Sequence, residues 1–353
     1  MAKYSVSVLI PMYNRKYFIN DCIESVLNQT FKDFEIIIRD DCSTDGVFEL
    51  VQEQFADHIS SGKIKLFRNK KNLGEALNMK KILEDATGKY VTVLHNDDLY
   101  LPNALEYLFG IAEKFSADVV HSTNFFSSAT DGVIQKGSRL FKTCCDNNPV
   151  NQVQIMQNDL LFRFNEWLSG GTFQDPQYNI FNRQFIFENN LLSDENCDTF
   201  LFTLKWLMKA KIFVKAPEPV YICRKSSDSQ TNERTVSESR MEKTVTKNIA
   251  LFNLVDKFLS KVEFFRDNKE LQYFVKAKIF IAHECLSDDT TKILINKNYA
   301  DLYNSIEKVF KKHFGKDAVY LALLYHWSHI MQFNKNRVQT ILQDCLKILS
   351  EEI

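Results

Sequence analysis

The sequence predicts an α/β fold with a mostly parallel sheet in residues 1–230, followed by an α-helical domain in residues 231–353. Residues 5–125 alternate between strand-like and helix-like segments with short connections, the pattern of a parallel sheet with helices on both faces. The strand-like segments are almost continuously apolar, as burial on both faces requires. From about residue 235 onward helical periodicity dominates, which indicates a separate helical domain or bundle.

The first part is expected to contain five strands, at residues 5–10, 34–39, 63–68, 90–94 and 118–122. Helices are expected between consecutive strands, because apolar residues recur there at the spacing of one helix face. Residues that commonly begin or end elements mark four boundaries: Pro11 ends the first strand, Asn14 caps the first helix, Gly88 stops the helix before the fourth strand, and Pro102 begins the helix after it.

Residues 126–224 show a weaker pattern. Residues 126–160 are polar and contain glycine and proline, so we expect an irregular loop there. A helix is expected at residues 199–210 and a strand at residues 214–224.

Composition and charge exclude several classes of protein. Of the 353 residues 45% are apolar and 25% charged, and the net charge is −1, so nothing indicates nucleic-acid binding. No stretch approaches the roughly 20 apolar residues of a membrane span, and the N-terminal apolar run is too short for a signal peptide. The eight cysteines lack CxxC spacing, so we expect reduced thiols in a cytoplasmic protein. Peripheral contact with the inner face of the membrane through the helical part is the minority alternative.

Polar side chains end three of the predicted strands. Pro11–Asn14 follows the first strand, Asp40–Asp41 the second and His95–Asp98 the fourth. Because the carboxyl ends of parallel strands meet at one edge of a sheet, we expect these groups to converge. A nucleotide requires an aromatic wall, a carboxylate for a base N–H group and a cation for its phosphates. The three groups contain a candidate for each role: Tyr13, Asp41 and Asp97.

Two alternatives remain for the paired carboxylates. Asp97 and Asp98 favour a divalent metal, because adjacent carboxylates are costly to hold together without a cation, but one Asp capping the next helix also fits. Asp41 could equally be a turn residue. The sequence contains no GxxxxGK[ST], GxGxxG or GxSxG motif, which disfavours P-loop, dinucleotide-binding and serine-hydrolase chemistry. Nucleotidyl transfer is disfavoured too, since no glycine-rich loop follows the first strand.

Five segments in register over about 100 residues carry a family resemblance: VSVLIPMYN, SVLNQTF, FEIIIRDDCSTDG, NLGEALN and GKYVTVLHNDD followed by xxxP. Together they resemble the inverting family 2 glycosyltransferases, which have a GT-A fold and use nucleotide-diphosphate sugars. Three later segments extend the resemblance: FNRQFIFENNLL, CDTFLFTLKWLMKAK and EPVYICR.

The resemblance implies roles for individual residues. Seven residues correspond to the nucleotide pocket: Pro11, Tyr13, Asn14, Asp41, Asn72, Gly74 and Asn96. Among these, Asp41 matches the carboxylate that reads the base. Asp97 matches the last Asp of the DxD motif and His95 occupies its first position, so both are expected metal ligands. Asp98 is expected behind them, and Asp198 matches the general base.

Several positions depart from the family pattern. His95 replaces an Asp, and an imidazole is a better ligand for Mn²⁺ than for Mg²⁺. Cys197 stands where a Glu precedes the base, so the base could instead be Glu195, or Asp194 if the register slips.

Three further residues concern the surroundings of the site. Arg39 replaces a usually apolar residue before the Asp pair of the second strand. Arg224 is expected near the site, on the acceptor side or behind it. Lys225 could supply a point charge for the diphosphate where some relatives have a histidine.

The expected activity is transfer of a sugar from a nucleotide sugar, with UDP favoured, to a hydroxyl of a glycan or lipid-linked glycan. The expected cofactor is Mn²⁺ or Mg²⁺, and inversion follows from a single displacement assisted by a carboxylate base. Bacterial surface polysaccharide synthesis is the setting that the resemblance implies. The helical domain could mediate homo-oligomer formation. A catalytically impaired sugar-nucleotide-binding or assembly protein is the alternative, suggested by His95 and Cys197.

Overall fold

The computed structural model describes residues 2–128, 140–144, 149–168, 176–192, 199–224, 250–251, 253–268, 272 and 275. The chain divides into two compact units, Met1–Ser229 and Gln230–Ile353, and each is described by itself.

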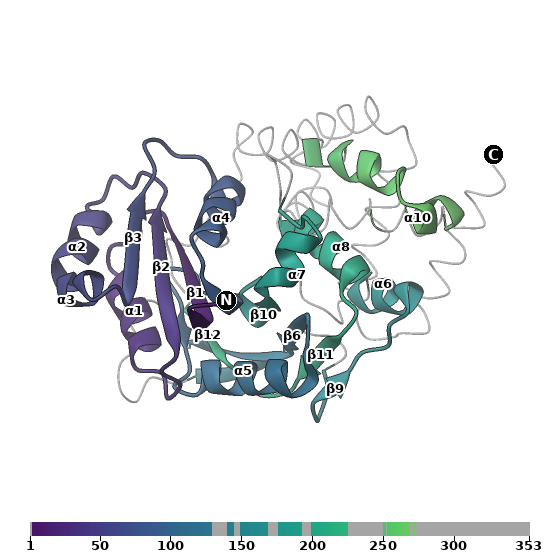
Figure 1. Ribbon diagram of the computed structural model, residues 1–353, viewed down its shortest axis with the longest axis horizontal. Helices are drawn as coiled ribbons and strands as arrows, with labels where there is room; N and C mark the ends of the chain where they lie inside the picture. Colours follow the sequence, from purple (N-terminus) through teal and green to yellow (C-terminus); the bar gives the residue numbers. More distant parts are fainter. Residues whose placement is uncertain are drawn as a thin grey trace, which may run out of the picture. The chain divides into compact units, whose positions relative to one another are not determined.

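Among the described residues, the first unit contains an eight-stranded sheet with the order β3-β2-β1-β4-β10-β6-β11-β9 (Figure 1). Its strands are β1 (Tyr4–Met12), β2 (Phe34–Asp40), β3 (Ile64–Arg68), β4 (Gly88–Val93), β6 (Val119–Ser122), β9 (Gln154–Ile155), β10 (Asn179–Asn182) and β11 (Phe213–Ala216). Pairing is parallel between β1 and β2, β1 and β4, β2 and β3, and β6 and β11, which confirms the expected mostly parallel sheet. β10 runs antiparallel to β4 and β6, and β9 runs antiparallel to β11.

A second sheet has the order β5-β12-β7-β8 in the described part of the unit. Its strands are β5 (Leu99–Tyr100), β7 (Asn124–Ser128), β8 (Leu140–Cys144) and β12 (Tyr221–Cys223). The expectation of an irregular loop at residues 126–160 was therefore wrong where β7, β8 and β9 lie. These strands are short, and β7 pairs with β12 from a distant part of the sequence, so no local pattern indicates them.

Helices pack on both faces of the large sheet. In the first unit they are α1 (Ile19–Leu27), α2 (Val47–Gln54), α3 (Ala56–Ser60), α4 (Glu75–Glu84), α5 (Ala104–Phe115), α6 (Leu160–Leu168), α7 (Arg183–Glu188) and α8 (Thr199–Lys209), with a 3₁₀ turn at Pro176–Tyr178. Apolar residues of α1, α2 and α5 share one core cluster with alternate residues of β1 and β2. α4 contacts β1 and β2 through residues outside that cluster, on the opposite face.

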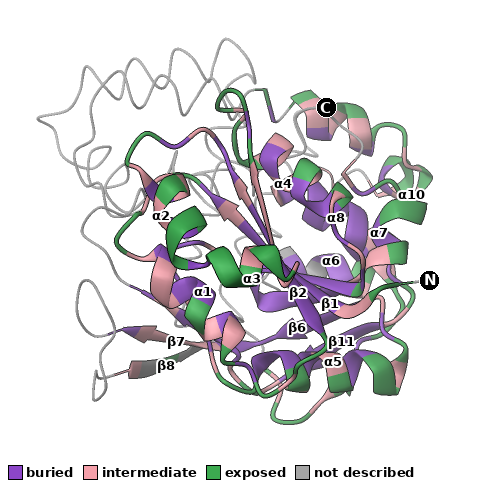
Figure 2. Cartoon of the chain, turned by 60° about the vertical axis from the view of Figure 1, so that its left-hand side comes forward, coloured by how far each residue is buried: buried purple, intermediate pink, exposed green. Residues whose placement is uncertain are grey.

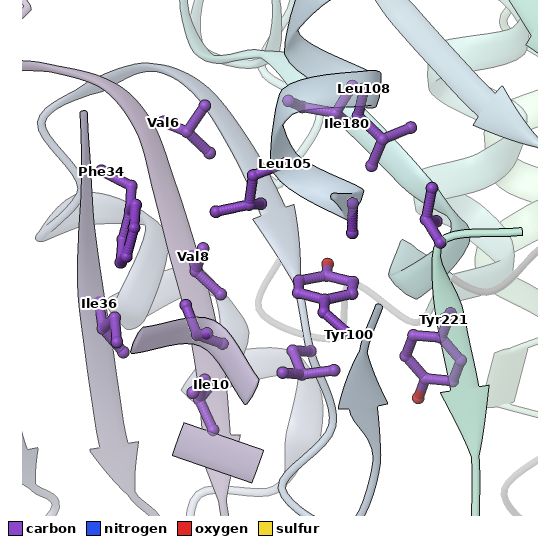
Figure 3. Close-up of a cluster of buried hydrophobic side chains, with 14 of the residues drawn as sticks. Val6, Val8, Ile10, Phe34, Ile36, Tyr100, Leu105, Leu108, Ile180 and Tyr221 are labelled. Carbon is purple, nitrogen blue, oxygen red and sulfur yellow. The ribbon is translucent and has the colours of Figure 1, made fainter. Parts of the chain in front are cut away.

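The core lies between β1, β2 and the helices of the first face. Val6, Val8 and Ile10 of β1 are fully buried, and Figure 3 shows them gathered with side chains of β2, α5 and β12. Figure 2 shows the sheet strands as mainly buried and the outer surfaces of α2 and α3 as largely exposed. This core holds in place the carboxyl ends of β1, β2 and β4, which the polar groups follow.

The first strand runs past its predicted end at Pro11 and finishes at Met12. Leu9 O accepts a hydrogen bond from Leu94 N, so the odd-numbered residues of β1 direct their backbone groups toward β4. The pairing of β1 with β4 ends at Leu9. Pro11 therefore lacks its N–H group where no β4 partner needs it, while Met12 still pairs with Asp40 of β2.

Three other predicted boundaries differ in the structure. α1 begins at Ile19 rather than after Asn14, which does not cap it. Gly88 is the first residue of β4 and not a helix stop; a Cβ there would lie 2.5 Å from Ser7 N, so glycine permits the close approach of β1 and β4. Pro102 precedes the first residue of α5, Ala104, by two residues.

In the second unit, residues 250–251 and 253–259 are helical, and α10 (Glu263–Asp267) follows. Leu251, Val255 and Leu259 are buried at helical spacing. The helical domain expected at residues 231–353 falls mostly outside the described residues and stays a prediction. Within the part of the chain that the structure describes, no helix combines the length and apolar character that a membrane span needs.

Candidate nucleotide and metal site

The carboxyl ends of β1, β2 and β4 meet at one edge of the large sheet. Asp41 N donates to Met12 O at 2.8 Å, which continues the pairing of β1 and β2 past the end of β2. Asn96 Nδ2 donates to Asn14 O at 2.9 Å and so joins the segment after β4 to the segment after β1. The expected convergence of the three polar groups is thus present.

The turn after β1 is held in an unusual backbone conformation. Asn14 and Arg15 have φ angles of 57° and 71°, in the left-handed region that costs a non-glycine residue about 1 kcal/mol or more. Asn14 N donates to Ser43 Oγ at 2.7 Å, and Asn14 Oδ1 accepts from Thr44 N at 3.1 Å, so the loop after β2 fixes this turn. Tyr13, just before it, is 43% exposed, which leaves its ring accessible to a ligand.

Asp41 is almost completely buried and accepts three hydrogen bonds from the protein. Its Oδ1 accepts from Leu73 N at 2.8 Å and Asn69 Nδ2 at 2.9 Å, and its Oδ2 accepts from Gly74 N at 2.8 Å. An ionised carboxylate offers about four acceptor positions, so Oδ2 retains one for a ligand N–H group. Asp41 therefore organises the turn before α4, and this does not exhaust its capacity to bind a base.

Asn72 and Gly74, two other predicted pocket residues, lie beside Asp41. Asn72 Oδ1 accepts from Gly74 N at 2.9 Å. Gly74 has a φ of 81°, which favours glycine, and no heavy atom lies within 4 Å of the position that its Cβ would take. Glycine is thus favoured at this position by the backbone angle and not by close packing, and the space beside Gly74 is open.

His95, Asp97 and Asp98 form a candidate metal cluster directly after β4. One ligand atom from each residue lies within 4.8 Å of the others. The Asp97 side chain is 26% exposed, and its Oδ2 lies 3.9 Å from Arg15 Nε. The two predicted metal ligands are therefore together, with a positive charge facing one of them.

Asp98 is buried behind this cluster. Its Oδ2 accepts a hydrogen bond from the Tyr221 hydroxyl, and its Oδ1 accepts from Arg224 N at 2.7 Å. Burial, together with the negative charge of Asp97, raises the pKa of Asp98 to about 6, against the opposing effects of His95 and of the two hydrogen-bond donors. The negative charge of Asp97 thus disfavours the ionised form of Asp98, and a cation bound at the cluster would relieve this repulsion.

Arg224 ties the loop after β4 to α1. Its Nη1 donates to Asp21 Oδ2 at 2.8 Å, its Nη2 to Phe18 O at 2.8 Å and its Nε to Asp97 O. The guanidinium group also lies 4.9 Å from the centre of the Phe18 ring. Because all three nitrogens donate to the protein, the structure places Arg224 as a support of the loop behind the cluster.

The donor set of the cluster suits a divalent cation. His95 and Asp97 supply a nitrogen and carboxylate oxygens, which fit Mn²⁺ better than Mg²⁺. Each oxygen of Asp98 accepts one hydrogen bond from the protein, and these bonds anchor the loop that carries His95 and Asp97.

Sequence reasoning missed three residues that shape the site. Tyr221 holds Asp98, Asn69 holds Asp41, and Cys22 Sγ donates to His95 O at 3.4 Å. Each comes from a different element from the residue that it contacts, so only the tertiary fold reveals it. Burial raises the pKa of the Cys22 thiol, which keeps it protonated as a donor.

Several predicted residues lie outside the described part of the chain. These are Asp198, Glu195, Asp194, Cys197 and Lys225. Their assignments stay predictions.

The fold and the cluster together define a GT-A domain, the fold of many nucleotide-sugar-dependent transferases. Glycosyl transferase family 2 matches residues 7–189, more than half of the chain, and the chain belongs to this family. The matched segment contains most of β1, all of β2 to β10 and every described residue of the candidate site except Tyr221 and Arg224.

Individual relatives match parts of the chain. Putative glycosyltransferase EpsE of Bacillus subtilis is 39% identical over 109 residues, which cover 31% of this chain and 38% of EpsE. Putative teichuronic acid biosynthesis glycosyltransferase TuaG of the same species is 40% identical over 101 residues, 29% of this chain and 39% of TuaG. Cholesterol galactosyltransferase of Borreliella burgdorferi is 30% identical over 214 residues, 59% of this chain and 56% of that protein. The match thus spans less than two thirds of each relative.

Among solved structures, S. aureus TarS 1-349 in complex with UDP-GlcNAc is similar in fold, with a TM-score of 0.60. The likeness covers 97% of this chain and 92% of the TarS chain at 17% sequence identity. At this identity the comparison concerns the fold alone.

Proposed function

We propose that this family 2 glycosyltransferase transfers a sugar from a UDP-sugar to a hydroxyl of a glycan or lipid-linked glycan, with inversion at the anomeric carbon. The observation that carries the proposal is the convergence of Tyr13, Asp41 and the cluster of His95 and Asp97 at one edge of the sheet. This edge is where ligands bind in open α/β sheets.

The choice of nucleotide and setting is supported by relatives. TarS, which has a similar fold, was crystallised with UDP-GlcNAc. TuaG is named for teichuronic acid biosynthesis. We therefore assign UDP as the nucleotide and a bacterial surface polysaccharide as the pathway's product.

On the donor side, different residues at the sheet edge bind the base and the diphosphate of the nucleotide. The free position on Asp41 Oδ2 accepts the N3–H group of uracil, and the exposed ring of Tyr13 lies against the base. His95 and Asp97 would hold Mn²⁺ or Mg²⁺, which neutralises the charge that develops on the departing diphosphate. Arg224 keeps the loop that carries these two residues in place.

On the acceptor side, Asp198 removes the proton from the acceptor hydroxyl as the oxygen attacks the anomeric carbon. The bond to the diphosphate breaks in the same displacement, so the configuration inverts and no covalent intermediate forms. Glu195 is the alternative base.

A thermal-shift panel tests the donor half of the proposal. The full-length protein is titrated with UDP, GDP, ADP and CDP, each with and without Mn²⁺. A ligand at 100 times its Kd stabilises the folded state by about 2.7 kcal/mol, so UDP with Mn²⁺ should give the largest rise in Tm. A larger shift with another nucleotide would overturn the choice of UDP, and no shift with any would overturn nucleotide binding.

The variant Asp198→Asn separates the enzyme from a non-catalytic binding protein of the same fold. We expect UDP binding to persist while sugar transfer is lost. Full transfer by this variant would reject Asp198 as the base and turn attention to Glu195. A wild-type protein that binds UDP but neither transfers nor hydrolyses any UDP-sugar would favour the binding-protein alternative.

A further inference from the structure

Arg39 of β2 directly precedes the Asp40–Asp41 pair and follows three isoleucines, Ile36–Ile38. Its side chain is only 13% exposed. Nη1 donates to Asn69 Oδ1 at 3.2 Å, and Nη2 forms an ion pair with Asp85 at the end of α4. The guanidinium carbon lies 4.7 Å from the centre of the Phe67 ring. Three groups thus fix the direction in which Arg39 presents its donor to Asn69.

Asn69 passes this orientation on to Asp41. Its Nδ2 donates to Asp41 Oδ1 at 2.9 Å and to Asn78 Oδ1 at 2.8 Å. Asn78 Nδ2 in turn donates to Arg39 O at 3.1 Å, which closes a ring of hydrogen bonds. Asn69 and Asn78 are both buried, so water does not substitute readily for any member.

The chemistry of the ring permits one orientation of the Asn69 amide. A guanidinium group only donates hydrogen bonds and an ionised carboxylate only accepts them. The Asn69 oxygen must therefore face Arg39, and its NH₂ group must face Asp41. Without Arg39 the Asn69 oxygen loses its donor, so the amide is held only by the bonds of its NH₂ group to Asp41 and Asn78 and holds Asp41 Oδ1 less firmly.

We propose that Arg39 is a positioning residue for base selection: through Asn69 it fixes the Asp41 carboxylate so that it accepts an N–H group from uracil and rejects cytosine. This inference rests on the proposed function of Asp41. Cytosine presents an unprotonated N3 where uracil presents N3–H, so a fixed carboxylate attracts uracil and repels cytosine. A carboxylate that is held less firmly, by Leu73 N and Gly74 N but no longer by a fixed Asn69 amide, discriminates less between the two bases.

The test is the ratio of UDP and CDP affinities, measured by calorimetry on the full-length protein with Mn²⁺. For Arg39→Met we expect the Kd for UDP to rise about 3- to 10-fold, the effect of one lost hydrogen bond, while the Kd for CDP changes by less than about 2-fold. Arg39→Lys keeps the charge but cannot reach Asp85 and Asn69 together, so its ratio should lie between wild type and Arg39→Met. Equal weakening of both nucleotides, or no change in either, would overturn the proposal.

A matched control separates positioning from general loss of structure. Lys65→Met removes the ion pair between Lys65 and the buried Glu35, together with the hydrogen bond from Lys65 Nζ to Asp85 O. It does not remove a bond to Asn69. This variant should lose stability and keep the wild-type ratio of UDP to CDP affinity. A ratio that falls equally in Lys65→Met would show that the effect of Arg39 is only structural.

Three further variants, Asp41→Asn, Asn69→Ala and the double variant Arg39→Met/Asn69→Ala, show which step of the argument fails if the expected result is not obtained. Asp41→Asn should abolish discrimination between UDP and CDP; if it does not, the proposed role of Asp41 fails and the role of Arg39 fails with it. If Asp41→Asn abolishes discrimination and Arg39→Met leaves it intact, only the inference about Arg39 fails. The double variant Arg39→Met/Asn69→Ala should be no worse than Asn69→Ala alone, because both changes break one path. Additive losses would exclude Asn69 as the connection.

Discussion

Two pairs of adjacent aspartates stand at the carboxyl ends of β2 and β4, the strands on either side of β1, and their surroundings differ. After β2, Asp40 and Asp41 are both buried, and each accepts hydrogen bonds from several protein donors. After β4, Asp98 is buried in the same way, but the Asp97 side chain is 26% exposed and lies 3.9 Å from Arg15 Nε. The same dipeptide thus provides a fixed acceptor in one place and an available ligand in the other.

The difference in burial and bonding partners indicates which member of each pair would contact a ligand under the proposed function. In the β2 pair the second residue, Asp41, contacts the backbone of the open turn before α4, while Asp40 pairs with Arg68 at 3.0 Å and with Ser43. In the β4 pair the first residue is accessible and the second anchors the loop. Burial and bonding partners, and not residue type, therefore decide the role.

The variant Asp97→Asn tests most directly whether Asp97, the accessible member of the β4 pair, binds the cation. We expect sugar transfer to fall by about 100- to 1,000-fold, because the charge that would hold the cation is lost where the diphosphate charge develops. The Mn²⁺-dependent rise in Tm should disappear, while the stability of the metal-free protein hardly changes. Asp45→Asn, an exposed Asp on the same rim outside the cluster, serves as the control. Retention of the Mn²⁺ response by Asp97→Asn would refute the metal assignment.

Arg224→Met addresses the buried member of the β4 pair. The Arg224 side chain is completely buried, and its loss removes one donor each from Phe18 O, Asp97 O and Asp21 Oδ2. We expect a loss of about 2–4 kcal/mol in the free energy of unfolding by denaturant, together with weaker Mn²⁺ binding. Arg183→Met, which removes a bond to Gly88 O away from the rim, should cost less and leave Mn²⁺ binding unchanged. If Arg224→Met and Arg183→Met had equal effects on stability and on Mn²⁺ binding, Arg224 would not be a specific support of the cluster.

Glu35, a buried carboxylate on β2 away from the rim, extends the comparison to a purely structural case. Burial favours its neutral form, but hydrogen bonds from Lys65, Ser7 and Thr87 outweigh burial and hold its pKa below the ordinary value of 4.5. Because the folded-state pKa is the lower one, this stabilisation is present above about pH 4.5 and is lost as pH falls through the folded-state pKa.

The variant Glu35→Gln should therefore lose roughly 1–3 kcal/mol of unfolding free energy at pH 7. The difference between wild type and variant should shrink as the pH is lowered below 4.5, the ordinary pKa. Denaturant unfolding across this pH range measures it. A difference that stays constant with pH would show that Glu35 contributes no charge-dependent stability.

The smallest expected effect concerns Arg15, the charge that faces Asp97. Both side chains are partly exposed and their atoms are 3.9 Å apart, so solvent screens the pair. Arg15→Gln should tighten the binding of Mn²⁺ alone by about 2- to 5-fold, because a competing cation is removed. Calorimetric titration with MnCl₂ measures this. Weaker binding of Mn²⁺ would mean that Arg15 supports the cluster instead of competing with it.

The sequence predicted the elements that carry strong local patterns. β1, β2 and β4 come from apolar runs bounded by polar residues, and β3 and β6 come from shorter segments between predicted helices, so the existence of these strands and a mostly parallel sheet were foreseeable. β10 was not, because its insertion between β4 and β6 depends on pairing with two strands that are distant in sequence. Gly88 was misassigned because its role, the close approach to Ser7, is a tertiary contact.

The candidate site shows the same division. His95, Asp97 and Asp41 could be placed at one edge because each directly follows a strand of a parallel sheet. The residues that fix them, Tyr221 and Asn69, come from other elements, and their contacts depend on how those elements pack. Asn14 looked like a helix cap by type, but its side chain binds Thr44 N of the neighbouring loop instead.

The bond between Arg224 and Asp21 joins residues 203 positions apart, and this separation has a consequence for biosynthesis. During translation, β1, α1 and the loop after β4 leave the ribosome long before residue 224 does. The early strands can pair meanwhile, since their contacts are closer in sequence. The candidate metal cluster, however, gains its hydrogen bonds from Tyr221 and Arg224 only after β12 has been synthesised. Its assembly therefore belongs to a late stage in the folding of the first unit.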